Sequence, residues 1–254
     1  MSGSQHAFVA EQYGGRATDY VTSTVHSTGA DLDQIEAAVR GMRTARVLDL
    51  GCGGGHVSYR AAPHVAEVVA CDVTESMLEA VAATAAARGL TNIGVRQVAA
   101  EHLPFDDGSF DVVLCRFTAH HWADLEAGLR QACRVLKRGG LAIFVDSVAA
   151  ANPVLDTHLQ AMEVFRDISH VRNYSVAEWV GGLSRAGFAV DGICMRVLRM
   201  EFPTWIARTQ TPAANALSIR VLQEGSPKIV REHFAIGPDG SFDLQTATLS
   251  AHAV

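Results

Sequence analysis

From Thr44 to Val148 the chain alternates short apolar runs with stretches in which apolar residues recur at helical spacing. The apolar runs are short enough to be buried strands, and they cover residues 45–50, 66–72, 92–99, 109–117 and 140–148. Helical spacing covers residues 56–63, 74–89 and 123–140. Strands that alternate with helices form a mostly parallel sheet with helices on both of its faces. We therefore predict an α/β fold for this part of the chain.

The rest of the chain predicts further helices and two more strands, which would make the sheet seven-stranded. Helical spacing occurs in residues 8–40 with a break at Gly14-Gly15, in 153–186 as two helices, and in 203–235. Residues 188–202 indicate a long strand, and 236–252 a turn followed by an alternating strand. Because no repeat or low-complexity linker interrupts the chain, we expect one domain over 1–254. Its core would be 44–147, and 1–40 and about 150–235 would form cap helices.

The first predicted strand is followed by GCGGG at residues 51–55, which leaves bare backbone for a ligand to lie against. In an open parallel sheet, ligands bind at the carboxyl ends of the strands. A dinucleotide fingerprint needs a third glycine after Gly51 and Gly53, but His56 stands there, although Asp72 has the spacing of a ribose-binding acid. A P-loop is excluded because no lysine follows the glycines. An NAD-dependent oxidoreductase is therefore a weaker alternative, and it stays open.

Asp49, which comes just before the glycines, favours a ligand without phosphate. A fixed carboxylate would repel a pyrophosphate, but it could hydrogen-bond an amino group. The N–H groups at the start of the next helix suit a single carboxylate, and Asp72 suits the two hydroxyls of a ribose. An amine, a carboxylate, a ribose and an adenine together describe S-adenosylmethionine.

Four segments in this order resemble the motifs of the class I S-adenosylmethionine-dependent methyltransferases: VLDLGCGGG, VVACDVTESML, AAEHLPFDDGSFDVVLCRFTAHHW and ACRVLKRGGLAIF. The resemblance is greatest to the ubiquinone and menaquinone biosynthesis branch, and it covers about residues 44–147. It implies a Rossmann-like fold and in-line methyl transfer to an O, N or C atom of a small molecule, with S-adenosylhomocysteine as product. A protein that binds S-adenosylmethionine without turnover is a further alternative.

The resemblance also implies roles for individual residues at the cofactor. Asp49 would support its amino-acid end, and the backbone of Gly51, Cys52 and Gly53 would lie against it. Asp72 would bind the ribose. The other implied contacts are Val73, Met77, Ala100 and Glu101 at the adenine, the carbonyl of Arg116 at the methionine amino group, and Tyr20 and His121 as walls of the site.

One position departs from the family pattern. Relatives often read G-D-A-E before LPF, and the acid of that segment bonds the exocyclic amine of adenine. This chain reads VAAE at residues 98–101. That side-chain contact is therefore missing, and backbone groups or Glu101 would replace it.

The segment FTAHHWAD follows the fourth predicted strand and would face the transferred methyl group. His120 and His121 are the side chains there with ordinary pKa values near neutrality, so either could serve as a catalytic base or instead pack on the cofactor. No metal is expected, because adjacent histidines cannot readily share one ion and no Cys-x-x-Cys or His-x-x-x-His completes a set. Tyr13, Trp122 and Tyr174 are candidates for the acceptor pocket.

Charge and hydropathy argue against a nucleic-acid partner and against insertion into a membrane. The formal net charge is −6, the basic residues are dispersed, and the N-P-P-[YF] signature is absent, so no nucleic-acid partner is expected. No signal peptide or run of eighteen apolar residues is found, and membrane insertion is not expected. Five scattered cysteines indicate a reducing cytoplasm. The expected partner is a small-molecule methyl acceptor, bound by a monomer or a homodimer.

Overall fold

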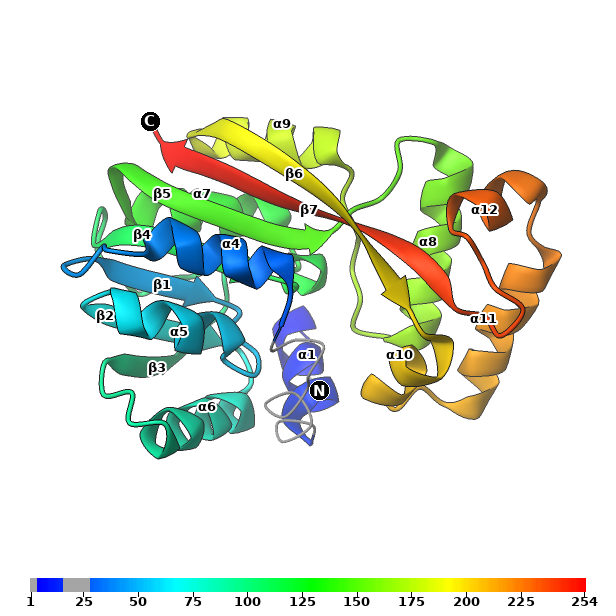
Figure 1. Cartoon of the computed structure of the whole chain (residues 1–254), viewed down its shortest axis with the longest axis horizontal. Helices are drawn as coiled ribbons and strands as arrows, with labels where there is room; N and C mark the ends of the chain where they lie inside the picture. The colour runs from blue at the N-terminus through cyan, green and yellow to red at the C-terminus, as the bar shows by residue number, and fades with distance from the viewer. Residues whose placement is uncertain (1–3, 16–27) are drawn as a thin grey trace.

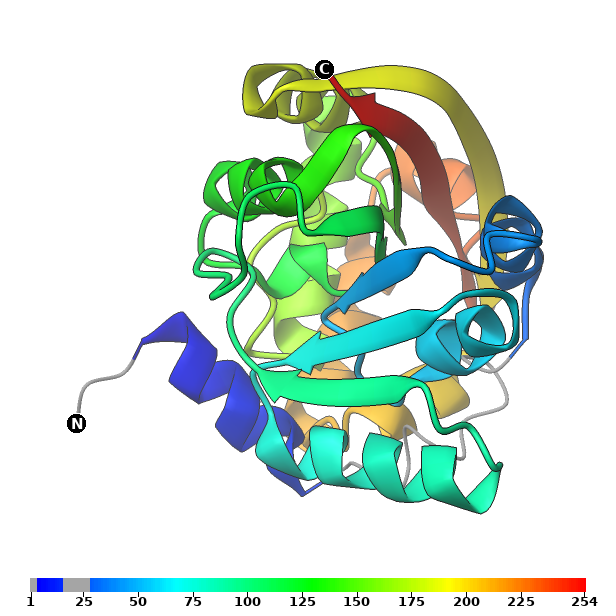
Figure 2. The ribbon, with the colours of Figure 1, turned by 90° about the vertical axis from the view of Figure 1, so that its left-hand side faces the viewer.

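The computed structural model describes residues 4–15 and 28–254. Its centre is a seven-stranded sheet with the order β3-β2-β1-β4-β5-β7-β6 (Figures 1 and 2). The first five strands are parallel, and β7 runs antiparallel to both β5 and β6. The predicted mostly parallel α/β fold is confirmed. The strands are β1 (Arg46–Leu50), β2 (Glu67–Asp72), β3 (Ile93–Gln97), β4 (Phe110–Arg116), β5 (Leu136–Ser147), β6 (Phe188–Met200) and β7 (Phe242–Ala253).

Helices cover both faces of the sheet because alternate strand residues point to opposite sides. On one face, Val47 packs in a cluster with residues of α4 (Ala30–Val39) and α5 (His56–Ala61). On the other face, Leu48 packs with residues of α7 (Leu125–Val135) and α9 (Val176–Ala186). Helix α6 (Glu75–Ala87) packs beside α5 through Leu78 and Val81.

A second group of helices lies beyond one end of the sheet, where β6 and β7 extend past their neighbours (Figure 1). Strand β7 pairs with β5 only from Thr246 onward, whereas its pairing with β6 begins at Phe242. The overhanging residues therefore belong to a separate apolar cluster, which we call the cap. Its helices are α8 (Pro153–Arg166), α10 (Phe202–Arg208), α11 (Ala213–Gly225) and α12 (Lys228–His233).

The amino-terminal helix α1 (Gln5–Gly14) buries none of its residues and is held by polar contacts. Ser76 of α6 donates a 2.8 Å hydrogen bond to the carbonyl of Gly14, and Gln5 donates a 2.7 Å bond to the carbonyl of Ser169. In Figures 1 and 2 the arrowheads of β1 and β2 point toward this helix. Helix α1 thus lies over the carboxyl ends of these strands, where the sequence predicted a ligand.

The boundary between α7 and β5 differs from the prediction. Helical spacing predicted a helix to residue 140, but α7 ends at Val135 and β5 begins at Leu136. Leu136 is buried and pairs with Phe110 as a strand residue, so the chain must become extended there. The sheet register then shifts near Gly139, whose φ of +72° suits glycine.

Candidate functional site

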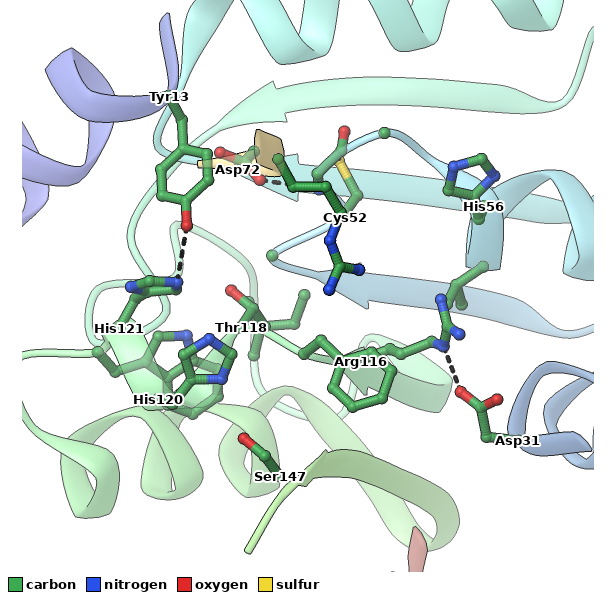
Figure 3. A pocket seen from close by; sticks show the side chains of 18 of the residues that line it. Tyr13, Asp31, Cys52, His56, Asp72, Arg116, Thr118, His120, His121 and Ser147 are labelled. Atoms are coloured by element: carbon green, nitrogen blue, oxygen red, sulfur yellow. Dashed lines mark hydrogen bonds and ion pairs between the residues drawn. The ribbon is translucent and has the colours of Figure 1, made fainter. Parts of the chain in front are cut away.

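A cavity of about 740 Å³ opens at the carboxyl ends of β1, β2 and β4 and continues to the cap. Its lining includes the glycine loop after β1, the segments that follow β2, β3 and β4, and residues of α1, α4, α8, β6 and α10. Its volume lies within the range typical of small-molecule sites. Figure 3 shows Tyr13, His120 and His121 on the left and Arg116 with Asp31 on the right.

The glycine loop is held by its own backbone and by β2. Cys52 donates a 2.8 Å backbone hydrogen bond to the carbonyl of Cys71, and Gly55 donates one of 2.8 Å to the carbonyl of Cys52. At Gly51, with φ +72°, an added Cβ would meet the Thr118 hydroxyl at 2.2 Å, so the two segments touch. At Gly53, with φ +48°, a Cβ would meet nothing within 4 Å. The loop is therefore packed at Gly51 and open at Gly53.

Asp49 is buried at the end of β1 and lines the cavity. Its Oδ2 accepts a 2.6 Å hydrogen bond from the hydroxyl of Ser58 in α5, while Oδ1 has no partner among the described residues. Burial raises the pKa of this carboxyl to about 7, against the opposing effect of the Ser58 bond. An unpartnered, buried carboxylate oxygen favours a positively charged ligand group.

Asp72 ends β2 and braces two loops. Its Oδ2 accepts a hydrogen bond from the N–H of Gly53 and its Oδ1 one from the N–H of Thr74, both at 2.9 Å. Burial raises the pKa of Asp72, and these backbone donors partly offset that rise. Each carboxylate oxygen retains lone-pair capacity for a further donor.

The chain turns sharply after β4. Phe117 has φ +52°, an uncommon backbone for a bulky side chain, and the turn brings Thr118 against Gly51. The Arg116 guanidinium lies 4.8 Å over the Phe117 ring and pairs with the buried Asp31 of α4. This positively charged side chain therefore lines the cavity in a fixed position.

Glu101 is buried and has three hydrogen-bonding partners. Its Oε1 accepts bonds from the N–H groups of Ala123 at 2.9 Å and Asp124 at 3.3 Å. Its Oε2 lies 2.9 Å from Nε2 of His6 in α1. This carboxylate therefore ties α1 to the turn before α7.

His120 lies in η2 (Ala119–His121) and contacts the last residues of β5. Its Nδ1 is 2.6 Å from Oδ1 of Asp146, which is 1% exposed. Asp146 also accepts the backbone N–H of His120 at 3.2 Å and that of Ser147 at 2.8 Å. Burial lowers the pKa of His120, but the charge and hydrogen bond of Asp146 and the charge of Glu163 together raise it, so the net shift is upward.

His121 has a different environment. Its Nε2 lies 3.2 Å from the Tyr13 hydroxyl, which also hydrogen-bonds to the carboxylate of Asp167 (Figure 3 shows the first contact). Its Nδ1 lies 3.2 Å from the carbonyl of Ser169. Burial and the neighbouring charge of His120 lower the pKa of His121 to about 4. His170 packs 5.7 Å from the His120 ring centroid, and burial lowers its pKa to about 2.

The cap and the neighbouring part of β6 supply lining residues that sequence reasoning missed. Glu163 and Arg166 of α8 form a 3.2 Å ion pair, and the Arg166 guanidinium lies 5.1 Å over the Trp205 ring. Arg196 of β6 donates to the hydroxyl of Thr248 at 2.7 Å. Three distant elements bring these side chains together, so no local motif could reveal them. The sequence did contain a signal for Asp146 as a site residue, because it is an acidic residue near the carboxyl end of a predicted strand.

The structure brings nearly all the predicted site residues to one cavity. Tyr20 lies outside the described residues. Tyr174 was expected in the acceptor pocket but does not line this cavity, because its ring packs edge-on against buried Trp179, 6.4 Å away, beneath Arg172. The predicted residues that do line the cavity are Tyr13, Asp49, Gly51, Cys52, Gly53, Asp72, Val73, Met77, Ala100, Glu101, Arg116, His120, His121 and Trp122.

None of the helices in the described part of the chain is long and apolar enough to span a membrane. Among residues 4–15 and 28–254, no group of three His, Cys, Asp or Glu side chains could hold a metal ion.

Comparisons with known proteins show that this chain is similar to methyltransferases. Residues 48–144 match the methyltransferase domain family. YafE of Escherichia coli K12 is 43% identical over 202 residues, which is 80% of this chain and 98% of YafE. The uncharacterized methyltransferase YcgJ of Bacillus subtilis is 37% identical over 194 residues, 76% of this chain and 77% of YcgJ.

Structure agrees with sequence. The crystal structure of YcgJ superposes with a TM-score of 0.85 at 32% identity, covering 88% of this chain and 97% of YcgJ. The ubiquinone/menaquinone C-methyltransferase UbiE of Rhizobium rhizogenes is 33% identical over 120 residues, only 46% of each chain, so likeness to that branch is partial. With its motifs, strand order and relatives in agreement, the chain belongs to the class I S-adenosylmethionine-dependent methyltransferases and is similar to YcgJ and YafE.

Proposed function

We propose that this enzyme transfers the methyl group of S-adenosylmethionine to an O, N or C atom of a small molecule held between the sheet and the cap. The observation that carries the proposal is the cavity itself. It extends from the glycine loop, which is flanked by the two acids Asp49 and Asp72, to residues of the cap. A donor and an acceptor could therefore bind side by side in one cavity.

The residues present fit S-adenosylmethionine. The unpartnered Oδ1 of buried Asp49 suits the amino group of the methionine moiety. Asp72 is held by two backbone donors and can still accept from the two ribose hydroxyls. The open side of Gly53 lets the ligand lie against the loop. Val73, Met77 and Ala100 provide an apolar wall suited to adenine.

The contacts of Glu101 and Trp122 suggest roles that differ from those expected from the sequence. Glu101 already accepts from two backbone N–H groups and lies against His6, so we assign it to holding α1 rather than to the adenine amine. Trp122 packs against Gly128, where an added Cβ would meet its ring at 2.4 Å. We therefore propose that only the cavity-facing part of Trp122 contacts the acceptor, while the rest of the ring stabilises the core.

The bound cofactor supplies an activated methyl group on a sulfonium, so the protein needs no strong electrophile of its own. The task of the chain is to position the acceptor and exclude water. Tyr13 of α1, the cap residues and His121 enclose the cavity on the acceptor side. This enclosure supports a small-molecule acceptor, as in the ubiquinone-type branch that we propose as a relative.

Cofactor binding tests the proposal directly. Calorimetry should show S-adenosylhomocysteine binding in the micromolar range and no binding of NAD. The variant Asp72→Ala should abolish measurable affinity, because it removes both the ribose acceptor and the brace of the Gly53 loop. Binding of NAD without S-adenosylhomocysteine would instead support an oxidoreductase.

Turnover separates an enzyme from a protein that only binds the cofactor. A panel of phenols, catechols, amines and enolic acids can be screened for transfer of a radiolabelled methyl group. Transfer to any acceptor by the wild type, and none by Asp72→Ala, would establish catalysis. Tight binding of S-adenosylhomocysteine with no transfer across the panel would favour the non-catalytic alternative.

A further inference from the structure

Two adjacent histidines line the same cavity, but the structure holds them in two different ways. The His120 ring faces Asp146 through Nδ1 at 2.6 Å. The His121 ring faces the Tyr13 hydroxyl through Nε2 at 3.2 Å and the Ser169 carbonyl through Nδ1 at 3.2 Å. One ring nitrogen of His120 therefore has a hydrogen-bonding partner among the described residues, whereas both ring nitrogens of His121 have one.

Asp146 is a fixed partner. It is 1% exposed, and its carboxylate is held by the backbone N–H groups of His120 and Ser147. An ionised carboxylate only accepts hydrogen bonds, so Nδ1 of His120 must carry the proton. In the neutral imidazole, Nε2 then carries the lone pair. No described residue hydrogen-bonds to this Nε2, and His120 lines the cavity.

We propose that His120 is the base of the methyl transfer and that buried Asp146 is its positioning residue, while His121 holds Tyr13 and α1 in place. This inference rests on the proposed function and extends it to the acceptor. A base is useful only if the reacting atom carries a proton that it must lose. The acceptor is therefore a hydroxyl, an N–H group or an enol, and not a tertiary amine or a thioether.

Methyl transfer with His120 as the base needs no reagent other than the methyl donor and the acceptor. The acceptor atom forms a bond to the methyl carbon as the methyl–sulfur bond breaks, and the electron pair of that bond stays on sulfur. The proton of the acceptor moves to Nε2 of His120, which becomes an imidazolium paired with Asp146. The cation lost at the sulfonium is replaced by one at His120, which returns its proton to solvent after product leaves.

The groups packed around His120 support this role. Asp146 of β5 raises its pKa, and Glu163 of α8 adds to that effect, while burial and Arg166 of α8 oppose it. His121 and His170 have lowered pKa values of about 4 and about 2, so both are neutral near pH 7. The imidazolium formed during transfer therefore has a carboxylate as its nearest charge.

Nitrogen-15 NMR of the histidine rings tests the inference without a known acceptor. The full chain is titrated with S-adenosylhomocysteine bound, and His120→Gln identifies the His120 signals. We expect His120 to titrate above the ordinary histidine pKa and to carry its proton on Nδ1 when neutral. His121 should remain neutral down to about pH 5, in line with its pKa of about 4.

Two carboxylate variants make the test specific. Asp146→Asn should lower the pKa of His120 by about one unit or more and mix its tautomers. The matched control Asp167→Asn alters the carboxylate on the His121 side and should leave the His120 signals unchanged. Unchanged His120 signals in Asp146→Asn, or a wild-type His120 protonated on Nε2, would overturn the inference. Absence of S-adenosylhomocysteine binding by the wild type would overturn the proposed function instead.

Discussion

The carboxylate of Asp49 accepts a 2.6 Å hydrogen bond from the Ser58 hydroxyl through one oxygen, and its other oxygen is buried without a partner in the described structure. Burial raises the pKa of this group to about 7. In the free protein near neutral pH, a far larger share of Asp49 is therefore protonated than of an ordinary aspartate. A cationic ligand group at Oδ1 would stabilise the ionised form, so ligand binding and proton release should be coupled.

We expect the affinity for S-adenosylhomocysteine to fall as the pH drops below about 7, because Asp49 must lose its proton before it can pair with an ammonium group. The loss should approach about tenfold per pH unit. Calorimetry at several pH values, in buffers of different ionisation enthalpy, measures both the affinity and the released proton. Asp49→Asn should bind weakly with little pH dependence, and a flat profile in the wild type would contradict this role.

Two glycine variants should separate loop packing from cofactor contact. Gly53→Ala places its Cβ in open space, so it should cost only about 1 kcal/mol of stability from its positive φ yet strongly weaken S-adenosylhomocysteine binding. Gly51→Ala places its Cβ 2.2 Å from the Thr118 hydroxyl and should lower stability more. Chemical denaturation and calorimetry on both variants make the comparison. Equal loss of stability, or unimpaired binding by Gly53→Ala, would argue against an open cradle.

The cofactor side of the site was predictable from sequence because it depends on short-range order along the chain. Asp49, Gly51 and Asp72 lie at the ends of two recognisable strands, and parallel strands bring their carboxyl ends to one edge. The acceptor side was not predictable in this way. Arg166 lies on α8, which follows β5, and Trp205 lies on α10, which follows β6, so the two side chains meet only through the tertiary packing of the cap.

Aromatic residues outside the motifs were the least predictable. The sequence makes both Tyr13 and Tyr174 candidates for the acceptor pocket, since both belong to helical or loop segments beyond the core. The structure places Tyr13 beside His121 and places Tyr174 against the Trp179 ring. Burial of the large indole of Trp179 decides the second case, and nothing local marks that packing.

The hydroxyl of Tyr13 links α1 to His121 and Asp167, although α1 buries none of its own residues. Tyr13→Phe should therefore release α1 more readily while leaving the sheet intact. Hydrogen exchange should become faster in residues 5–14 only, and S-adenosylhomocysteine should dissociate faster. The control Tyr174→Phe should change neither quantity. Unchanged exchange in α1 would show that the remaining contacts suffice to hold it.

Acid should destabilise the protein partly through His121, whose folded pKa of about 4 lies below its ordinary value near 6.5. The unfolded chain binds more protons between these two pH values, so the stability due to neutral His121 is complete above about 6.5 and is lost as pH falls toward 4. This contribution amounts to at most about 3 kcal/mol. Urea denaturation from pH 7 to 4 should show a smaller loss in His121→Asn than in the wild type. Parallel curves for the two proteins would contradict the lowered pKa.

The two histidines should differ most clearly in turnover with an acceptor found by the labelled-methyl screen. His120→Gln should lower kcat by about 10²- to 10⁴-fold with little change in KM, because it removes the base but keeps the shape of the pocket. His121→Gln should mainly weaken binding, since its ring holds Tyr13. The base must be neutral, and the pKa of His120 is raised, so wild-type kcat/KM should rise with pH through a value above 6.5.

Asp146→Asn should move that ascending limb to lower pH and also lower its plateau, because the remaining imidazole is less basic and no longer fixed in one tautomer. A purely structural role for Asp146 would lower the rate at every pH without moving the limb. The pH profile of kcat/KM therefore distinguishes the two roles. Full turnover by His120→Gln would instead mean that the acceptor loses its proton directly to water.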